Sequence, residues 1–138
     1  MKISARVQNT FDQHQVIVST NDREQSVAIA AKKEGLGSSV NGGELLLLSL
    51  ATCFCNDVYR EAARRKMNVA LVEVTVNGEF DKEGEPGYNI VYSTRVEAPG
   101  SSDVEIEELI EYVDRIAEIH NTLRKGVEVR RILRDEAV

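Results

Sequence analysis

Short segments in which hydrophobic and polar residues alternate recur along the chain, as in half-buried β-strands. Near the N-terminus the alternation covers residues 2–8 and 26–30, and residues 15–20 form a β-branched run that also predicts a strand. It returns within residues 70–98 on both sides of a polar tip, which predicts a long β-hairpin. The chain therefore begins with a small set of strands and has a second hairpin near its middle.

Helical patterns occupy much of the rest. Residues 44–66 contain no Gly or Pro and are rich in good helix formers. The first half of this segment is apolar nearly all round, so it must be enclosed, whereas the charged second half is expected to face water. In a domain this small, enclosing a helix from every side calls for a second subunit, so we expect a homodimer.

The remaining segments complete a single α+β domain over residues 1–138. Ser102 and Glu105 form a capping-box pattern before an apolar stripe at helical spacing, which predicts a second helical region. The predicted order is N-terminal strands and a Gly-rich loop over 1–43, a central helix over 44–66, a hairpin over 70–98, the second helical region over 102–124 and a last strand over 127–133.

Charge and composition limit the kinds of molecule that the protein is expected to bind. The 17 basic and 23 acidic residues give a net charge of −6, which disfavours nucleic acid and anionic membrane surfaces and favours a small neutral or apolar molecule. The longest apolar stretch, residues 45–55, is too short to cross a bilayer, and no export leader is apparent. We therefore expect a cytoplasmic protein whose two cysteines are reduced.

The two cysteines, Cys53 and Cys55, lie in the central helix. Residues two apart on a helix point about 200° apart, so these thiols can neither bridge each other nor share a metal ion. No His/Cys cluster has ligand spacing, so we predict no metal site. Cys53 either packs in the core or acts alone as a thiolate activated by a cation, for which Arg23, Arg6 and His120 are candidates.

His120 also has more than one interpretation. It could approach Cys53 and stabilise a thiolate, or it could be a partly buried side chain hydrogen-bonded to backbone. Together with Asn121 and Cys53 it suggests a thiol hydrolase as well. That class is less favoured, since a thiol nucleophile is usually activated at a helix start rather than within the helix.

Two sequence motifs carry a family resemblance. Residues 42–53, GGELLLLSLATC, resemble the first signature of the OsmC/Ohr family of thiol-dependent peroxidases, and residues 119–129, IHNTLRKGVEV, are similar to its second. The resemblance extends over nearly the whole chain in element order. It implies an OsmC-like α+β fold, with antiparallel sheets around two central helices in an intertwined homodimer. It also implies that Cys53 attacks hydroperoxide.

The chain departs from the family pattern at two places. In the family, the second cysteine, which resolves the sulfenic acid, stands just ahead of a Pro. The corresponding residues here are Ala117 and Glu118, so the resemblance is to a divergent branch without a resolving thiol. An external thiol or dithiol would then be the reductant, and no other cofactor is implied. The family's Arg-orienting Glu falls at Gly43; Glu44, one residue later, is a candidate for that role with Arg23, or simply an acid favoured at a helix start.

Two functions follow from the resemblance. The first is a single-cysteine peroxidase that reduces organic hydroperoxides in oxidative-stress defence, with the substrate in an apolar pocket at the dimer interface. The alternative is a catalytically weak or inactive dimeric protein that binds a small apolar ligand. The retained Cys53 favours the first function, and the missing resolving cysteine favours the second.

Overall fold

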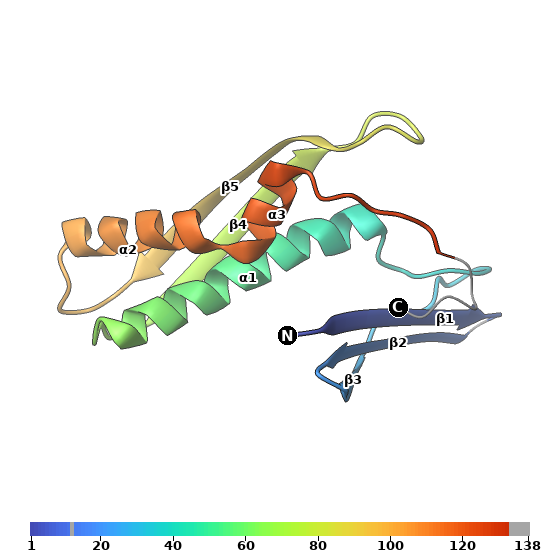
Figure 1. The fold of residues 1–138 in the computed structure, drawn as a ribbon, viewed down its shortest axis with the longest axis horizontal. Coiled ribbons are helices and arrows are strands. Elements are labelled where there is room, and N and C mark those ends of the chain that lie inside the picture. Colours follow the sequence, from blue (N-terminus) through green and yellow to red (C-terminus); the bar gives the residue numbers. More distant parts are fainter. Residues whose placement is uncertain (12, 133–138) are drawn as a thin grey trace. The chain divides into compact units, whose positions relative to one another are not determined.

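The computed structural model describes residues 1–11 and 13–132. The chain divides into two compact units, Met1–Leu45 and Leu46–Val138, and each is described by itself. The elements labelled in Figure 1 are β1 (Ile3–Thr10), β2 (Gln13–Thr20), β3 (Arg23–Val27), α1 (Gly42–Arg64), β4 (Leu71–Glu79), β5 (Tyr88–Glu97), α2 (Asp103–Ile116) and α3 (Glu118–Lys125). No helix in the described part of the chain is long and apolar enough to span a membrane.

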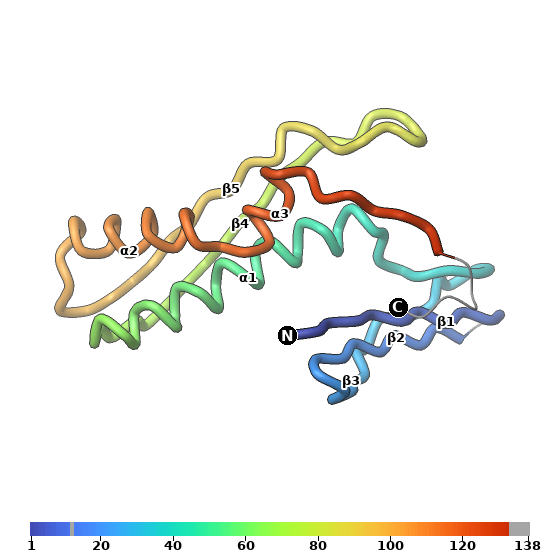
Figure 2. The backbone as a smooth tube through the Cα atoms, in the orientation of Figure 1, coloured from blue at the N-terminus to red at the C-terminus, as the bar shows by residue number. Residues whose placement is uncertain are grey.

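The N-terminal unit contains an antiparallel sheet in the order β1-β2-β3, which Figure 2 traces as a meander. β3 begins at Arg23, three residues before the predicted strand over 26–30. The reason is the turn before it: Asn21 and Asp22 both adopt positive φ, at 47° and 64°. Such a two-residue turn lets strand pairing resume at once, so Arg23 pairs opposite Thr20.

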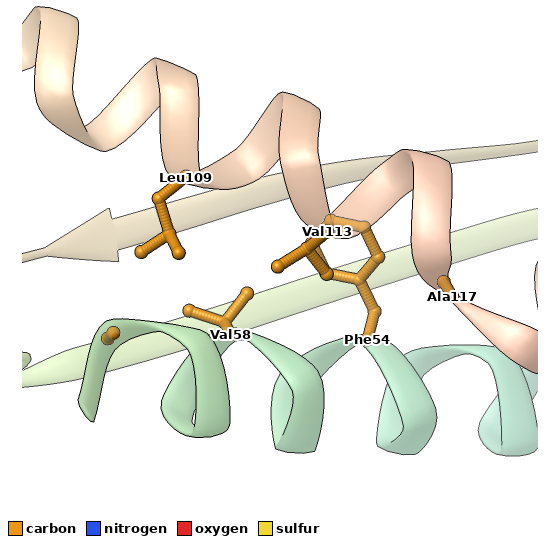
Figure 3. Close-up of a cluster of buried hydrophobic side chains, with 6 residues drawn as sticks. Phe54, Val58, Leu109, Val113 and Ala117 are labelled. Carbon is orange, nitrogen blue, oxygen red and sulfur yellow. The ribbon is translucent and has the colours of Figure 1, made fainter. Parts of the chain in front are cut away.

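The second unit has a helical layer on one side of the β4–β5 hairpin (Figure 1). Its core is a cluster of side chains from α1 and from the α2–α3 segment that are at most 2% exposed (Figure 3). Hairpin side chains, among them Val74 and Tyr92, pack against this cluster. The core residues are Phe54, Val58, Ala62, Leu109, Val113 and Ala117.

The charged half of α1 differs from the prediction that it faces water. Asp57 and Glu61 are only 3% and 4% exposed, because they lie on the turns that also carry the core residues. Each carboxylate is paired with an arginine on the outer side of the helix. Arg60 Nη1 lies 2.7 Å from Asp57 Oδ1, and Arg64 Nη1 lies 2.5 Å from Glu61 Oε1. Burial of these acids is thus compensated by partly exposed guanidinium groups.

The second helical region consists of two helices. The predicted capping box is confirmed at Ser102 and Glu105, and the predicted apolar stripe faces the core. At Ala117 the backbone leaves the helical conformation, with φ −60° and ψ 108°, and α3 then begins at Glu118. α3 ends at Lys125 and is capped by Gly126, which has φ 64°. The break gives α3 a direction of its own, and α3 brings new side chains to α1.

The predicted last strand over 127–133 is wrong for the described residues. Residues 127–132 have no regular secondary structure, and residue 133 lies outside the described residues. A strand is stabilised by hydrogen bonds to a neighbouring strand. No described strand of this chain pairs with 127–132, so alternation alone does not form the element there.

Candidate active site

Cys53 lies in α1 with two carboxyl groups beside its sulfur. Asp57 follows one helical turn later on the same face, and the Cys53 thiol donates a hydrogen bond to Asp57 Oδ2 at 3.7 Å. Glu118, the first residue of α3, places Oε2 4.0 Å from the same sulfur. The break at Ala117 therefore brings a second acid to a thiol that is partly buried.

These surroundings keep the thiol protonated. Burial raises the pKa of the Cys53 thiol, and the negative charges of Asp57 and Glu118 raise it further. A hydrogen bond with the Ile119 backbone acts in the opposite direction. An activated thiolate needs a pKa below the ordinary value, so the described part of this unit does not supply the cation that the sequence analysis sought.

Asp57 connects the thiol to a guanidinium. Burial raises the pKa of the Asp57 carboxyl, and the positive charge of Arg60 opposes this effect. The ion pair with Arg60 leaves Oδ2 directed to the Cys53 sulfur while Oδ1 contacts the arginine. Cys53, Asp57 and Arg60 thus form a short hydrogen-bonded chain, through which a proton leaving the sulfur has an acceptor.

The same acids raise the question of a metal ion. The ligand atoms of Cys53, Asp57 and Glu118 all lie within 4.8 Å of one another. Thiolate and carboxylate are both zinc ligands, but here Asp57 is already engaged by Arg60. This cluster was not predicted from the sequence, because Glu118 is 65 positions from Cys53 and no His/Cys spacing marks it. The spacing of one helical turn between Cys53 and Asp57 was the available sequence signal, and it would have revealed these two members of the cluster.

His120 does not contact the Cys53 sulfur through a hydrogen bond. Its ring is buried against Phe54 and Tyr92, with centroid distances of 5.5 and 4.9 Å. Both ring nitrogens lack a hydrogen-bond partner in the described structure, which contradicts the prediction of a bond to backbone. Burial lowers the pKa of His120, and the positive charge of Arg124 lowers it further. A neutral imidazole cannot stabilise a thiolate as a cation would.

Glu44 has the structural role expected of an acid at a helix start. Its Oε2 accepts a hydrogen bond from the Asn41 backbone at 2.7 Å, while Asn41 Oδ1 accepts one from the Glu44 backbone at 2.9 Å. Nine residues along a regular helix correspond to about 13.5 Å and the opposite face, which separates Glu44 from Cys53. Arg23 begins β3 in the N-terminal unit, and its proposed role toward the thiol stays a prediction.

Comparison with known proteins identifies the fold. The chain matches the family model for OsmC-like protein over residues 35–131. An OsmC-like protein from Mycoplasma pneumoniae has 18% sequence identity and a TM-score of 0.61, with 89% of each chain covered. An OsmC-like protein of unknown function from Vibrio cholerae has 14% identity and a TM-score of 0.63, over 88% of this chain and 93% of that one.

A third structure carries a functional description. It is an organic hydroperoxide resistance protein OsmC from Legionella pneumophila, with 18% identity, 94% of each chain covered and a TM-score of 0.57. Among curated proteins, no sequence matches the chain. The structural matches show the same α+β architecture, and the family model covers most of the chain. The family predicted from the two sequence motifs is therefore confirmed, and this chain belongs to the OsmC-like protein family.

Proposed function

We propose that this protein is a thiol-dependent peroxidase that reduces organic hydroperoxides, with Cys53 as the nucleophile. The observation that carries the proposal is the hydrogen bond from the Cys53 thiol to Asp57, whose carboxylate is paired with Arg60. It is supported by membership of a family in which the Legionella pneumophila protein is described as an organic hydroperoxide resistance protein. The corresponding role is in oxidative-stress defence.

In the first step the Cys53 sulfur attacks one oxygen of the peroxide. An S–O bond forms as the O–O bond breaks, so the sulfur is oxidised by two electrons and the peroxide is reduced. The thiol proton passes to Asp57, and from Asp57 to the departing alkoxide, which leaves as an alcohol. Arg60 keeps Asp57 ionised beforehand and so prepares it to accept the proton.

In the second step the sulfenic acid of Cys53 is reduced from outside. Ala117 occupies the position of the family's resolving cysteine and is fully buried in the core, where it offers no thiol. A first external thiol condenses with the sulfenic acid to give a mixed disulfide and water. A second external thiol then releases Cys53 and leaves as the external disulfide.

A homodimer is part of this proposal. Ile3 and Val7 on β1 are 68% and 60% exposed, and Leu48 in the apolar half of α1 is 57% exposed. Exposed apolar side chains such as these are typical of surfaces that another chain covers. A second copy could also supply the cation that Cys53 lacks in the described unit.

The test compares hydroperoxide consumption by three forms of the protein. With cumene hydroperoxide and excess dithiothreitol, we expect Cys53→Ser to lower the rate by about 100-fold or more, because the nucleophile is lost. Cys55→Ser is the matched control on the same helix and should retain the wild-type rate. Adding EDTA to each reaction tests whether a metal ion contributes. A wild-type rate no greater than that of Cys53→Ser would refute the enzymatic proposal.

A second candidate function is a binding protein for a small apolar ligand with weak peroxidase chemistry. The raised pKa of the Cys53 thiol favours it, because the thiolate is the form that attacks peroxides. The same three-way comparison separates the two functions. Equal rates for the wild type and Cys53→Ser, with the protein folded, would leave binding as the better supported function.

A further inference from the structure

The negative charges beside the Cys53 sulfur are only partly compensated. Asp57 Oδ2 lies 3.7 Å from the sulfur, and its other oxygen is paired with Arg60 at 2.7 Å. Arg60 also contacts Glu61, at 3.4 Å, so this one guanidinium is shared between two acids. Glu118 Oε2 lies 4.0 Å from the sulfur, and no ion pair among the described residues includes Glu118. Glu118 therefore contributes a free negative charge at the thiol.

Glu118 also lies on the solvent side of the thiol. Its side chain is exposed, whereas Cys53 is partly buried and Asp57 is only 3% exposed. At physiological salt, charges at a protein surface act over about 8 Å. A molecule that approaches the sulfur from water therefore meets the carboxylate of Glu118 before it reaches the sulfur, and the sign of its own charge affects how often it arrives.

This charge bears on the external thiol that reduces Cys53, and the inference rests on the proposed function. The first external thiol becomes attached to Cys53 as a mixed disulfide. A two-carbon spacer lets an ammonium group on that thiol reach a carboxylate 4.0 Å from the sulfur. A sulfonate or carboxylate on the same spacer would be repelled there.

We propose that Glu118 is a specificity-determining residue at Cys53, and that it selects a small, positively charged thiol, an aminothiol in the simplest case, as the reductant. The aminothiol forms an S–S bond with the sulfenic sulfur of Cys53, and its thiol proton leaves with the hydroxyl group as water. A second aminothiol attacks the external sulfur of the mixed disulfide. The bond to Cys53 breaks, Cys53 takes the second thiol proton, and two thiols have become one disulfide.

The first experiment measures the charge preference of Cys53 in one step, without peroxide. The Cys55→Ser protein, which has Cys53 as its single thiol, reacts with two methanethiosulfonates, one with a trimethylammonium-ethyl group and one with a sulfonatoethyl group. The ratio of the two rates is divided by the ratio for the same chain unfolded in urea, which removes the intrinsic reactivity of the reagents. We expect the folded protein to favour the cationic reagent about tenfold.

Variants in the Cys55→Ser background assign this preference to Glu118. Glu118→Gln should reduce it to about threefold, because one of the nearby charges is lost. Any change in the pKa of Cys53 affects both rates equally and cancels in the ratio. Glu108→Gln, which makes the same charge change on the exposed side of α2, should keep the tenfold preference. In about 1 M salt, where the screening length is about 3 Å, the preference should largely disappear.

Two results would overturn the role of Glu118. One is equal reaction with the two reagents, or a preference for the anionic one, in the Cys55→Ser protein. The other is a cationic preference that Glu118→Gln leaves unchanged.

The second experiment identifies the reductant. Cumene hydroperoxide is supplied with 2-aminoethanethiol, 2-mercaptoethanol or 2-mercaptoethanesulfonate, which share the two-carbon spacer and differ in charge. We expect the rate of the wild type to fall in that order, and the cationic-to-anionic ratio to fall about threefold in Glu118→Gln. Because both proteins use the same thiols, the intrinsic reactivities of the thiols cancel in this comparison.

The outcomes separate this inference from the proposed function. Turnover with dithiothreitol, together with a cationic-to-anionic ratio that is the same in the wild type and in Glu118→Gln, would overturn the selection of an aminothiol and retain the peroxidase. Absence of turnover with every thiol, dithiothreitol included, would refute the peroxidase and with it the aminothiol as reductant. The reaction with the two methanethiosulfonates would still decide whether Glu118 selects charge at Cys53.

Discussion

Cys53 and His120 are the two candidate residues that the sequence analysis brought together, and their surroundings are opposite in kind. The thiol is partly buried beside two carboxyl groups. The imidazole is buried among aromatic rings with no polar partner. Burial is the main cause of both pKa shifts, upward for the thiol and downward for the imidazole. Both groups are therefore held uncharged at neutral pH.

Cys53 and His120 belong to two motifs of the same family, yet the structure places their side chains in different surroundings. On α1, Cys53 and Phe54 point about 100° apart. Cys53 lies against the start of α3 at Glu118, while Phe54 lies against His120, one half-turn further along. A shift of one residue on α1, from Cys53 to Phe54, and of two on α3, from Glu118 to His120, thus separates a thiol beside two carboxyl groups from an apolar region.

The largest expected effect comes from removing the ring that covers His120. Phe54 is fully buried in the core, so Phe54→Ala should destabilise the protein by about 3–5 kcal/mol. Water would then reach the imidazole, and its pKa should return toward the ordinary value. Urea denaturation measures the stability, and NMR titration of the His120 ring measures the pKa.

The control for this substitution is Tyr59→Ala, which alters a half-exposed aromatic side chain on the same helix. We expect it to change stability by about 0.5 kcal/mol or less. If Phe54→Ala cost no more than Tyr59→Ala, the core described around Phe54 would be incorrect.

A smaller effect concerns His120 itself. Its pKa is lower in the folded than in the unfolded protein, so the unfolded state binds the proton first as pH falls. The free energy of unfolding is therefore unaffected by His120 titration above about pH 6.5. It declines as the pH falls from there to the pKa of His120 in the folded protein. His120→Leu should remove that decline and stabilise the protein by about 1 kcal/mol at pH 7.

Urea denaturation across this pH range checks both statements. His14→Leu is the matched control, since it removes the other histidine and leaves His120 in place. On acidification, the stability of the wild type should fall more steeply than that of His120→Leu. If it does not, the assignment of His120 as a buried neutral group would be contradicted.

The smallest effect is expected at the thiol. Glu118→Gln removes a negative charge 4.0 Å from the sulfur and should lower the pKa of Cys53. At this distance and exposure, the rate of iodoacetamide alkylation at pH 7.5 should rise about fivefold or less. Glu108→Gln, on the exposed side of α2, is the control and should leave the rate unchanged. An unchanged rate in Glu118→Gln would mean that this acid does not act on the thiol.

Much of the fold was predictable from local pattern. The strands, the long helix and the capping box at Ser102 follow from alternation, helix propensity and side-chain capping, all of which act over a few residues. The break at Ala117 was not predictable, because no Gly or Pro marks it. The strand predicted over 127–133 depends on a pairing partner, which a local pattern does not reveal.

The candidate site was predictable only in part. Cys53 was found from its motif, and the Cys53–Asp57 spacing could have revealed one neighbour. The burial of Asp57 was missed, because its charge was taken to mean exposure. Glu118 and the aromatic surroundings of His120 come from the packing of α3 on α1, which brings together residues far apart in sequence.

The Asp114 carboxylate has a consequence for the whole arrangement. It accepts hydrogen bonds from Tyr92 on β5 and from Arg124 on α3, while itself belonging to α2. An eight-residue helix such as α3 is not stable in isolation and takes its orientation from such anchors. A single acidic side chain therefore ties three elements together, and the alignment of α3 with both the sulfur and the imidazole depends on it.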